Sequence, residues 1–134
     1  MRVRCIKNEV AAIAEGKVRD RIRRSIHLDG PMTDLQVGRE YEVQALEVRD
    51  AGLWLYLHTV AANDFPYPYP AEMFEFRDKT LPVGWGIRLQ AKEGGVLLKT
   101  VTFSEWANDE HFYERLVSGD PEAVGVYQRR MTRS

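Results

Sequence analysis

The sequence predicts an α+β protein: a small SH3-like, partly open antiparallel β-barrel or bent sheet, with an early helix and two C-terminal helices. Three observations predict this fold. Five or six short strand-like runs follow one another through tight turns. Apolar residues at helical spacing precede these runs, and more follow them. A flat antiparallel sheet covered by the helices is the second architecture that fits this order.

The chain of 134 residues has the size of one domain. We expect a β-rich core over about 36–101 and a helical part over 102–132, with no linker between them. One cysteine, Cys5, excludes an intrachain disulfide, fits a reducing compartment and is expected in the core. No signal-peptide pattern and no membrane-spanning apolar run occurs. These features predict a cytoplasmic protein without a membrane partner.

The N-terminal third contains a strand followed by a helix. Residues 2–7 alternate, with Val3 and Cys5 on one face. Apolar residues from 9 to 26 recur at helical spacing. Gly16 weakens the middle of this helix by about 1 kcal/mol relative to alanine, so two shorter pieces also fit. The run L-D-G-P at 28–31 ends it.

The central hairpin carries the most informative pattern. Residues 41–49 alternate, and the phase slips near Ala45–Leu46, which predicts a β-bulge. The D-A-G turn at 50–52 leads to a second strand over 53–60. Three leucines share one face of that strand, and the other face carries Trp54, Tyr56 and His58. This aromatic face either binds a partner or is covered by the closing helices as a second core.

A proline-tyrosine run, F-P-Y-P-Y-P, ends at Pro70. Its prolines fix φ and hold the preceding residues extended. The spacing is not that of a P-x-x-P ligand. The run is therefore a stiff connection into a strand at 72–77, or one that adds Tyr67 and Tyr69 to the Trp54/Tyr56 patch.

The C-terminal half predicts a second hairpin and two helices. Residues 85–92 and 96–101 form the hairpin around an E-G-G turn. T-F-S-E resembles a capping box with Thr102 as N-cap of a helix that ends at Ser118–Gly119. Asp120 is the predicted N-cap of the last helix, and Pro121 its first residue.

Several segments together resemble a family of small bacterial proteins. The residues that carry the resemblance, over about 35–118, are V-G-R-E-Y-E-V, Y-P-A-E-M-F-E and L-P-V-G-W. They are similar to a family pattern V-G-K-x-Y-x-V, Y-P-A-x-L-F-E and L-P-x-x-W. No activity, cofactor or catalytic residue comes with the family. Some small bacterial proteins of this kind resemble immunity proteins of toxin systems, which implies a protein partner.

Charge is unevenly distributed along the chain, although the net charge is only −1. Residues 1–30 hold eight basic and four acidic side chains, and residues 104–123 hold six acidic and one basic. The two regions attract each other within the fold or present separate charged surfaces. A basic run at 17–24 offers the alternative function of nucleic-acid binding by a small barrel, through Arg19, Arg23 and Arg24.

No sequence pattern for catalysis is present. There is no nucleophile elbow, phosphate loop or dinucleotide fingerprint. His111 and Glu114 have a metal-capable spacing, but no further ligand pattern accompanies them. We therefore expect no metal and no cofactor, and a small enzyme is only the third hypothesis.

The leading hypothesis is a non-enzymatic protein that binds a macromolecular partner, and an immunity-type toxin inhibitor is its most concrete form. In that form the predicted acidic helix, which carries Asp109, Glu110 and Glu114, faces a basic toxin site, and charge complementarity speeds association. The expected partner-binding residues lie on the aromatic face, the proline-tyrosine run and the acidic helix: Trp54, Tyr56, His58, Tyr67, Tyr69, Asp109, Glu110 and Glu114.

Overall fold

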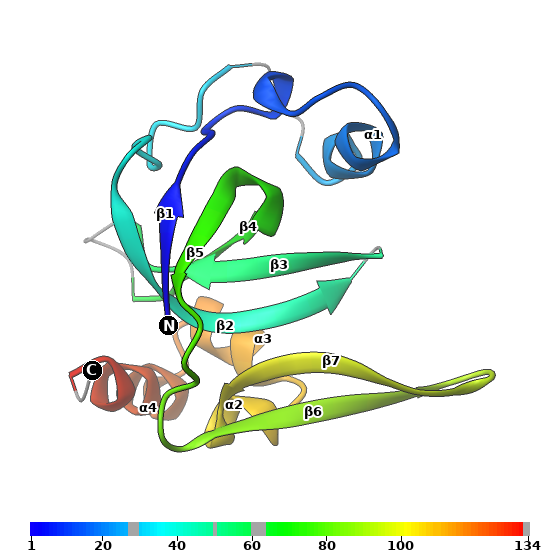
Figure 1. Ribbon diagram of the computed structural model, residues 1–134. Coiled ribbons are helices and arrows are strands. Elements are labelled where there is room, and N and C mark those ends of the chain that lie inside the picture. The colour runs from blue at the N-terminus through cyan, green and yellow to red at the C-terminus, as the bar shows by residue number, and fades with distance from the viewer. Residues whose placement is uncertain (27–29, 50, 60–63, 133–134) are drawn as a thin grey trace.

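The structure, a computed structural model, describes residues 1–26, 30–49, 51–59 and 64–132. These residues form an α+β fold with an open, antiparallel sheet, as the sequence predicts (Figure 1). The strands are β1 (Arg2–Cys5), β2 (Glu40–Arg49), β3 (Gly52–Leu57), β4 (Tyr67–Pro70), β5 (Phe74–Asp78), β6 (Trp85–Lys92) and β7 (Gly95–Phe103). The α-helices are α1 (Lys17–Arg23), α2 (Ser104–Ala107), α3 (Phe112–Val117) and α4 (Pro121–Thr132), and two 3-10 turns are η1 (Val10–Ala12) and η2 (Ala71–Met73).

Strand β2 lies at the centre of the sheet. One of its edges pairs with β3, and the other pairs first with β1 and then with β7. The sheet continues from β3 to β4, from β1 to β5 and from β7 to β6. Helix α1 lies at one end of the molecule, and α2, α3 and α4 lie at the other (Figure 1).

The predicted β-bulge is present in β2. The register to β3 shifts between Val43 and Ala45, one residue before the predicted place. Tyr41 and Val43 therefore face one core, whereas Ala45 faces another. Leu46 then packs on the first core again. The extra residue of this bulge causes the phase slip seen in the sequence.

Two hydrophobic cores lie on opposite sides of the sheet. The first includes Val3 and Cys5 of β1, Leu55 and Leu57 of β3, and Ile22 of α1. The prediction that Cys5 is a core residue is confirmed. The second core joins the sheet to the C-terminal helices through Ala45, Tyr56, Phe103, Trp106, Phe112, Leu116, Ala123 and Tyr127.

The early helix is shorter than a continuous 9–26 segment. It divides into η1 and α1, which is the two-piece alternative. Gly16 between them has φ +143°, a left-handed conformation that favours glycine and does not continue a helix. The predicted stop at 28–31 falls partly outside the described residues, as do Asp50 of the predicted turn and Val60 of the predicted strand.

The proline-tyrosine run forms strand β4, paired with β3. Prolines are tolerated there because β4 is an edge strand. Tyr67 and Tyr69 lie opposite Leu57 and Leu55, so they share the face of the leucines. The expectation that these tyrosines join the Trp54/Tyr56 patch is therefore wrong. The following strand, β5, begins after η2 at Phe74 rather than at residue 72.

The capping box at Thr102 is not formed. Thr102 belongs to β7, and its hydroxyl donates to the Gln44 carbonyl oxygen at 2.7 Å. Helix α2 begins two residues later without a side-chain cap, and the predicted long helix is divided into α2 and α3. By contrast, the Asp120 cap is confirmed, since its carboxylate accepts the Ala123 backbone N–H at 3.1 Å.

Candidate functional site

The predicted aromatic face is buried. Trp54 is 1% exposed and Tyr56 is 3% exposed. The guanidinium of Arg49 lies over the Trp54 ring at 4.3 Å from its centroid. Neither aromatic ring is therefore available to a partner on this surface, and the expectation of an exposed Trp54/Tyr56 patch is corrected.

The C-terminal helices cover Tyr56. Its ring packs edge-on against Trp106 and Tyr113, with centroids 5.2 and 4.9 Å apart. Its hydroxyl donates to a Glu47 carboxylate oxygen at 3.2 Å. Burial raises the pKa of the Tyr56 hydroxyl, and the adjacent Glu47 charge adds to the effect. The alternative of a second core is the arrangement found.

Tyr69 is buried in the first core and Tyr67 packs partly against it. The Tyr69 hydroxyl donates to Asp34, and it also lies 2.8 Å from the Thr59 hydroxyl. Burial, followed by the Asp34 hydrogen bond, raises its pKa. His58 is partly exposed, and its ring lies edge-on to Tyr127 at 6.3 Å. Tyr69 thus links β4 to Asp34 and Thr59, and His58, which follows β3, contacts Tyr127 of α4.

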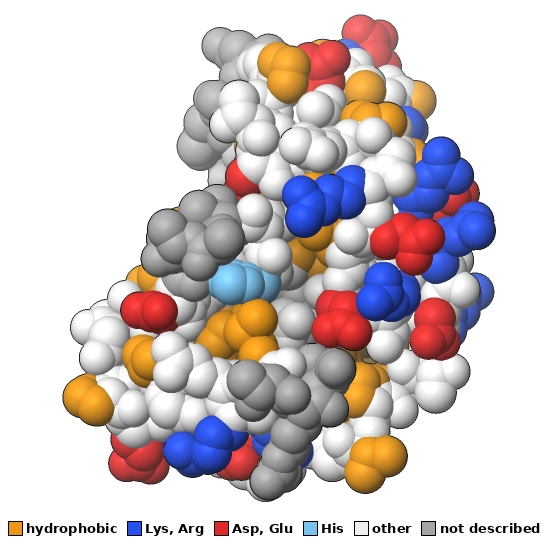
Figure 2. Space-filling model, turned by 90° about the vertical axis from the view of Figure 1, so that its left-hand side faces the viewer, with side chains coloured by type: hydrophobic (Ala, Val, Ile, Leu, Met, Phe, Trp, Pro, Cys, Tyr) orange, Lys and Arg blue, Asp and Glu red, His pale blue; other side chains and the backbone are white. Residues whose placement is uncertain are grey.

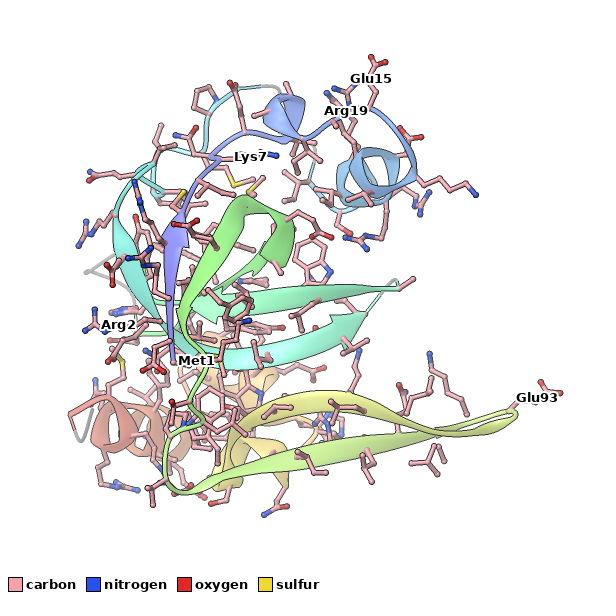
Figure 3. All side chains as sticks on the ribbon, viewed as in Figure 1. Met1, Arg2, Lys7, Glu15, Arg19 and Glu93 are labelled. Atoms are coloured by element: carbon pink, nitrogen blue, oxygen red, sulfur yellow. The ribbon has the colours of Figure 1, made fainter. Side chains whose placement is uncertain are left out.

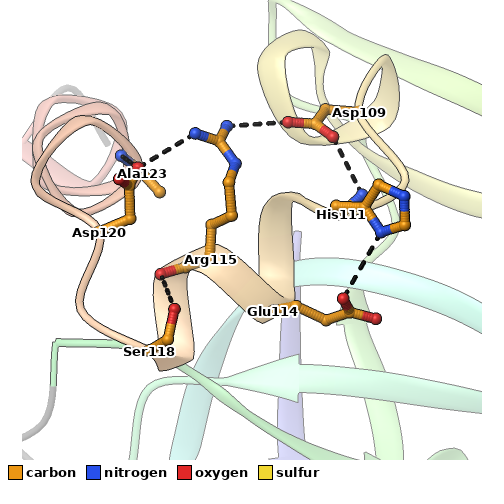
Figure 4. Close-up of polar contacts among 7 residues, drawn as sticks. All are labelled: Asp109, His111, Glu114, Arg115, Ser118, Asp120 and Ala123. Carbon is orange, nitrogen blue, oxygen red and sulfur yellow. Dashed lines mark hydrogen bonds and ion pairs between the residues drawn. The ribbon is translucent and has the colours of Figure 1, made fainter.

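The predicted acidic helix is only partly formed, because Asp109 and Glu110 lie in the turn before α3 and Glu114 alone lies within α3. Asp109 is partly buried, whereas Glu110 and Glu114 are exposed. Asp109 accepts the His111 backbone N–H at 3.0 Å and an Arg115 guanidinium N–H at 2.8 Å (Figure 4). These two donors hold the pKa of the Asp109 carboxyl below its ordinary value. Asp109 is therefore occupied within the fold, where it orients the turn before α3.

Glu110 and Glu114 have exposed side chains, at 73% and 78%. Their carboxylates flank the His111 ring, at 3.3 and 3.5 Å from its two nitrogens. Among the described residues, no lysine or arginine forms an ion pair with either carboxylate. These two residues are the exposed members of the predicted partner-binding set, since His58, Tyr67 and Asp109 are only partly exposed.

A groove separates the exposed acids from the β6–β7 hairpin. It has a volume of about 280 Å³ and is lined by Glu110, His111 and Glu114 on the α3 side, and by Arg88, Leu89, Gln90 and Lys99 on the hairpin side. A second hollow continues it toward α2 and shares Arg88, Leu89, Glu110 and His111 with it. We call this surface the acidic groove.

The predicted second hairpin is present as β6 and β7, but its exposure is a feature that the sequence pattern did not indicate. It extends beyond the rest of the sheet, and Glu93 lies at its far end (Figures 1 and 3). Every residue from Leu89 to Leu98 is exposed. Alternation in a strand normally indicates one buried face, but no described element covers residues 89–98, and α2 packs on the hairpin nearer its base, where Gly86 lies close to Ala107.

The basic helix is only partly free to bind nucleic acid. Arg19 donates to Glu15 at 2.9 Å, and the two side chains lie together in Figure 3. Arg21 binds Glu72 at 2.6 Å and the Ala51 carbonyl oxygen at 3.0 Å. Arg23 and Arg24 are exposed. The predicted phosphate-binding set is thus reduced to these last two arginines.

The two charged ends of the chain do not pair with each other among the described residues. The N-terminal arginines pair mainly with acids of neighbouring strands, as Arg2 does with Glu40 and Glu42 and Arg4 does with Glu75. Figure 2 shows basic and acidic side chains intermingled on the face that it presents. The C-terminal acids pair locally, for example Glu105 with Arg130.

Within the described part of the chain, no group of three metal-ligating side chains comes together, and no helix is long and apolar enough to cross a membrane. Comparisons with family models, with curated proteins and with solved structures found no match to this chain. The geometry of the site therefore carries the proposal of function.

Proposed function

We propose that the protein binds a protein partner that carries a basic surface, and that the contact is made at the acidic groove rather than at the aromatic face. The observation that carries the proposal is the pair of exposed carboxylates of Glu110 and Glu114, with which no lysine or arginine of the described chain forms an ion pair, although Arg88 and Lys99 line the opposite side of the groove. Fixed charges of one sign attract an oppositely charged partner and accelerate its docking.

An immunity-type inhibitor is the concrete form of this proposal. The exposed acids would enter a basic active site of a toxin, while Leu89 at the same groove supplies apolar contact. The predicted resemblance to small bacterial proteins, the predicted SH3-like barrel and the predicted cytoplasmic location are consistent with this form, and each of them stays a prediction.

The test is co-purification with the products of the adjacent genes, followed by stopped-flow association with the product that binds. We expect the double substitution Glu110→Gln, Glu114→Gln to lower the association rate about tenfold or more at low salt, with a smaller effect at high salt. The matched control is Glu93→Gln at the hairpin tip, which is exposed and distant from the groove. The proposal fails if none of the neighbouring gene products binds this protein and none becomes toxic when the protein is absent.

Nucleic-acid binding by Arg23 and Arg24 is the second candidate, because both side chains are exposed. Replacing both with alanine would then lower affinity for duplex DNA or RNA and reduce its salt dependence by about two counterions. No binding at low salt would remove this candidate.

A small enzyme is the third hypothesis. Asp34, Thr59 and Tyr69 form a polar cluster, and two of them line a hollow of about 520 Å³. Their side chains are hydrogen-bonded to one another, so they stabilise the fold and supply no free nucleophile among the described residues.

A further inference from the structure

The β6–β7 hairpin has an apolar face and a polar face. Cross-strand partners share a face, and the register pairs Leu89 with Leu98 and Ala91 with Val96. With Ile87, these residues form one apolar face, on which all five side chains are exposed. The opposite face of β6 carries Arg88, Gln90 and Lys92.

Strand β6 also has an unpaired edge. It pairs only with β7 among the described residues. It is eight residues long, has no proline and contains no inserted residue, because the bulge of this hairpin is on the β7 side at Lys99. A long edge strand with exposed apolar side chains is a template for pairing with another strand.

We propose that the edge of β6 pairs antiparallel with the β6 edge of a second copy of this chain, with Leu89 on the two-fold axis. The two hairpins then form a continuous four-stranded sheet, and the interface is isologous. This proposal rests on the unpaired edge of β6 and does not need the proposed function, although Leu89 also lines the acidic groove.

The sequence of β6 selects this register. With Leu89 opposite Leu89 of the partner subunit, Ile87 lies opposite Ala91, so apolar side chains meet apolar side chains. On the other face Arg88 lies opposite Gln90, and Lys92 lies opposite Gly86. No two basic side chains are directly opposite in this register.

The neighbouring registers bring like charges together. Moving the axis to Arg88 places two arginines opposite each other, and moving it to Gln90 places Arg88 opposite Lys92. A shift that pairs odd with even positions puts the apolar faces of the two copies on opposite sides of the sheet. Registers centred on Ile87 or Ala91 avoid both faults too, but they pair only residues 85–89 or 90–92 of β6. The register centred on Leu89 avoids both faults and pairs residues 86–92, almost the whole strand.

The charges of the polar face also have acids nearby. Arg88 lines the same groove as Glu110 and Glu114 of its own chain. In the four-stranded sheet the basic side chains of both copies gather on this face, and the acids of both copies offset their repulsion.

Sedimentation equilibrium of the full chain tests the association. We expect the wild type to reach twice the 15.5 kDa chain mass at concentrations on the order of 100 μM. Leu89→Lys places two lysines on the axis and should weaken dimerisation at least about tenfold. The control is Leu97→Lys, since Leu97 is equally exposed at 54% but lies on β7, on the polar face of the hairpin.

Cysteine cross-linking tests the register. Leu89→Cys should form a disulfide-linked dimer on mild oxidation. Ile87→Cys and Ala91→Cys should cross-link only when the two variants are mixed, because position 87 of one copy lies about 13 Å along the strands from position 87 of the other. The wild type, with Cys5 buried, is the control.

Three results would overturn the proposal. They are a monomeric wild type over the whole concentration range, a dimer that Leu89→Lys leaves intact, and self-cross-linking by Ile87→Cys. Unfolding midpoints of each variant, compared with the Leu97→Lys control, separate lost association from lost folding.

Discussion

Two buried tyrosines of the second core differ in one respect that gives opposite expectations for the same substitution. Tyr127 is 1% exposed, and its hydroxyl has no hydrogen-bond partner among the described residues. Tyr56 is buried in the same core, but its hydroxyl donates to Glu47. Removing one oxygen atom from each ring changes the packing little and changes the hydrogen bonding in opposite ways.

The magnitudes follow from the desolvation of the hydroxyl. A buried polar group without a partner costs about 1–3 kcal/mol, so Tyr127→Phe should raise the free energy of unfolding by about 1 kcal/mol. Tyr56→Phe removes a hydrogen bond to a carboxylate and should lower it by about 1–2 kcal/mol. The two variants should therefore differ by about 2–3 kcal/mol.

Urea unfolding followed by tryptophan fluorescence measures both values, since Trp106 lies in the same core. Unchanged m-values would show that the comparison concerns stability and not the compactness of the unfolded chain. A Tyr127→Phe variant that loses as much stability as Tyr56→Phe would refute the reasoning, because it would mean that the Tyr127 hydroxyl is bonded in the folded protein.

The remaining predictions concern the contact of α1 with the sheet and the response to alkali. Arg21→Ala should lower the free energy of unfolding by about 2–3 kcal/mol, because Glu72 loses its partner at a largely buried ion pair; the exposed Arg23→Ala is the control, and equal losses would contradict the reasoning. Gly52→Ala should lower the free energy of unfolding through the same contact, since a Cβ there meets the Arg21 guanidinium; in the double variant the two losses should be less than additive. Alkaline titration should destabilise the protein from about pH 10 upward, because unfolded tyrosines ionise there while burial raises the pKa of Tyr113 to about 12. The same sign holds for the other buried tyrosines, whose pKa burial also raises, so stability is present below pH ~10 and lost above it: Tyr56, Tyr69 and Tyr127. Unfolding measured from pH 8 to 11 checks this, and a flat profile would contradict it.

The fold was predictable where local chemistry determines it. Alternation placed the β2–β3 hairpin, and the slip in its phase revealed the bulge to within one residue. Asp120 before Pro121 marked the start of α4. The false capping box at Thr102 shows the limit, since the same residue continues a strand when its hydroxyl finds the Gln44 carbonyl across the sheet. Tertiary pairing overrode the local signal there.

The candidate site was less predictable because exposure depends on what covers a face. Alternation correctly placed Trp54 and Tyr56 on one side of β3, but it does not say that α2 and α3 cover Tyr56 or that Arg49 covers Trp54. The reverse error concerns β6, whose alternation suggests a buried face although Ile87 and Leu89 are exposed. The absence of an ion pair at Glu110 and Glu114 was easier to predict from the sequence. Arg115 is the only lysine or arginine within one helical turn of either residue in sequence, and it pairs with Asp109 and Asp120.

The position of β2 between two cores also determines how the molecule comes apart. Strand β2 contributes to both cores, so opening either core breaks hydrogen bonds of β2 and destabilises the other core. We therefore expect the two cores to unfold together, with the amide protons of β2 among the slowest to exchange with solvent. The distal β6–β7 hairpin has no share in either core, and its amides should exchange through local fraying alone. The two cores would thus unfold cooperatively, while the distal β6–β7 hairpin opens independently of them. Slower amide exchange in this hairpin would then indicate that a partner has bound it.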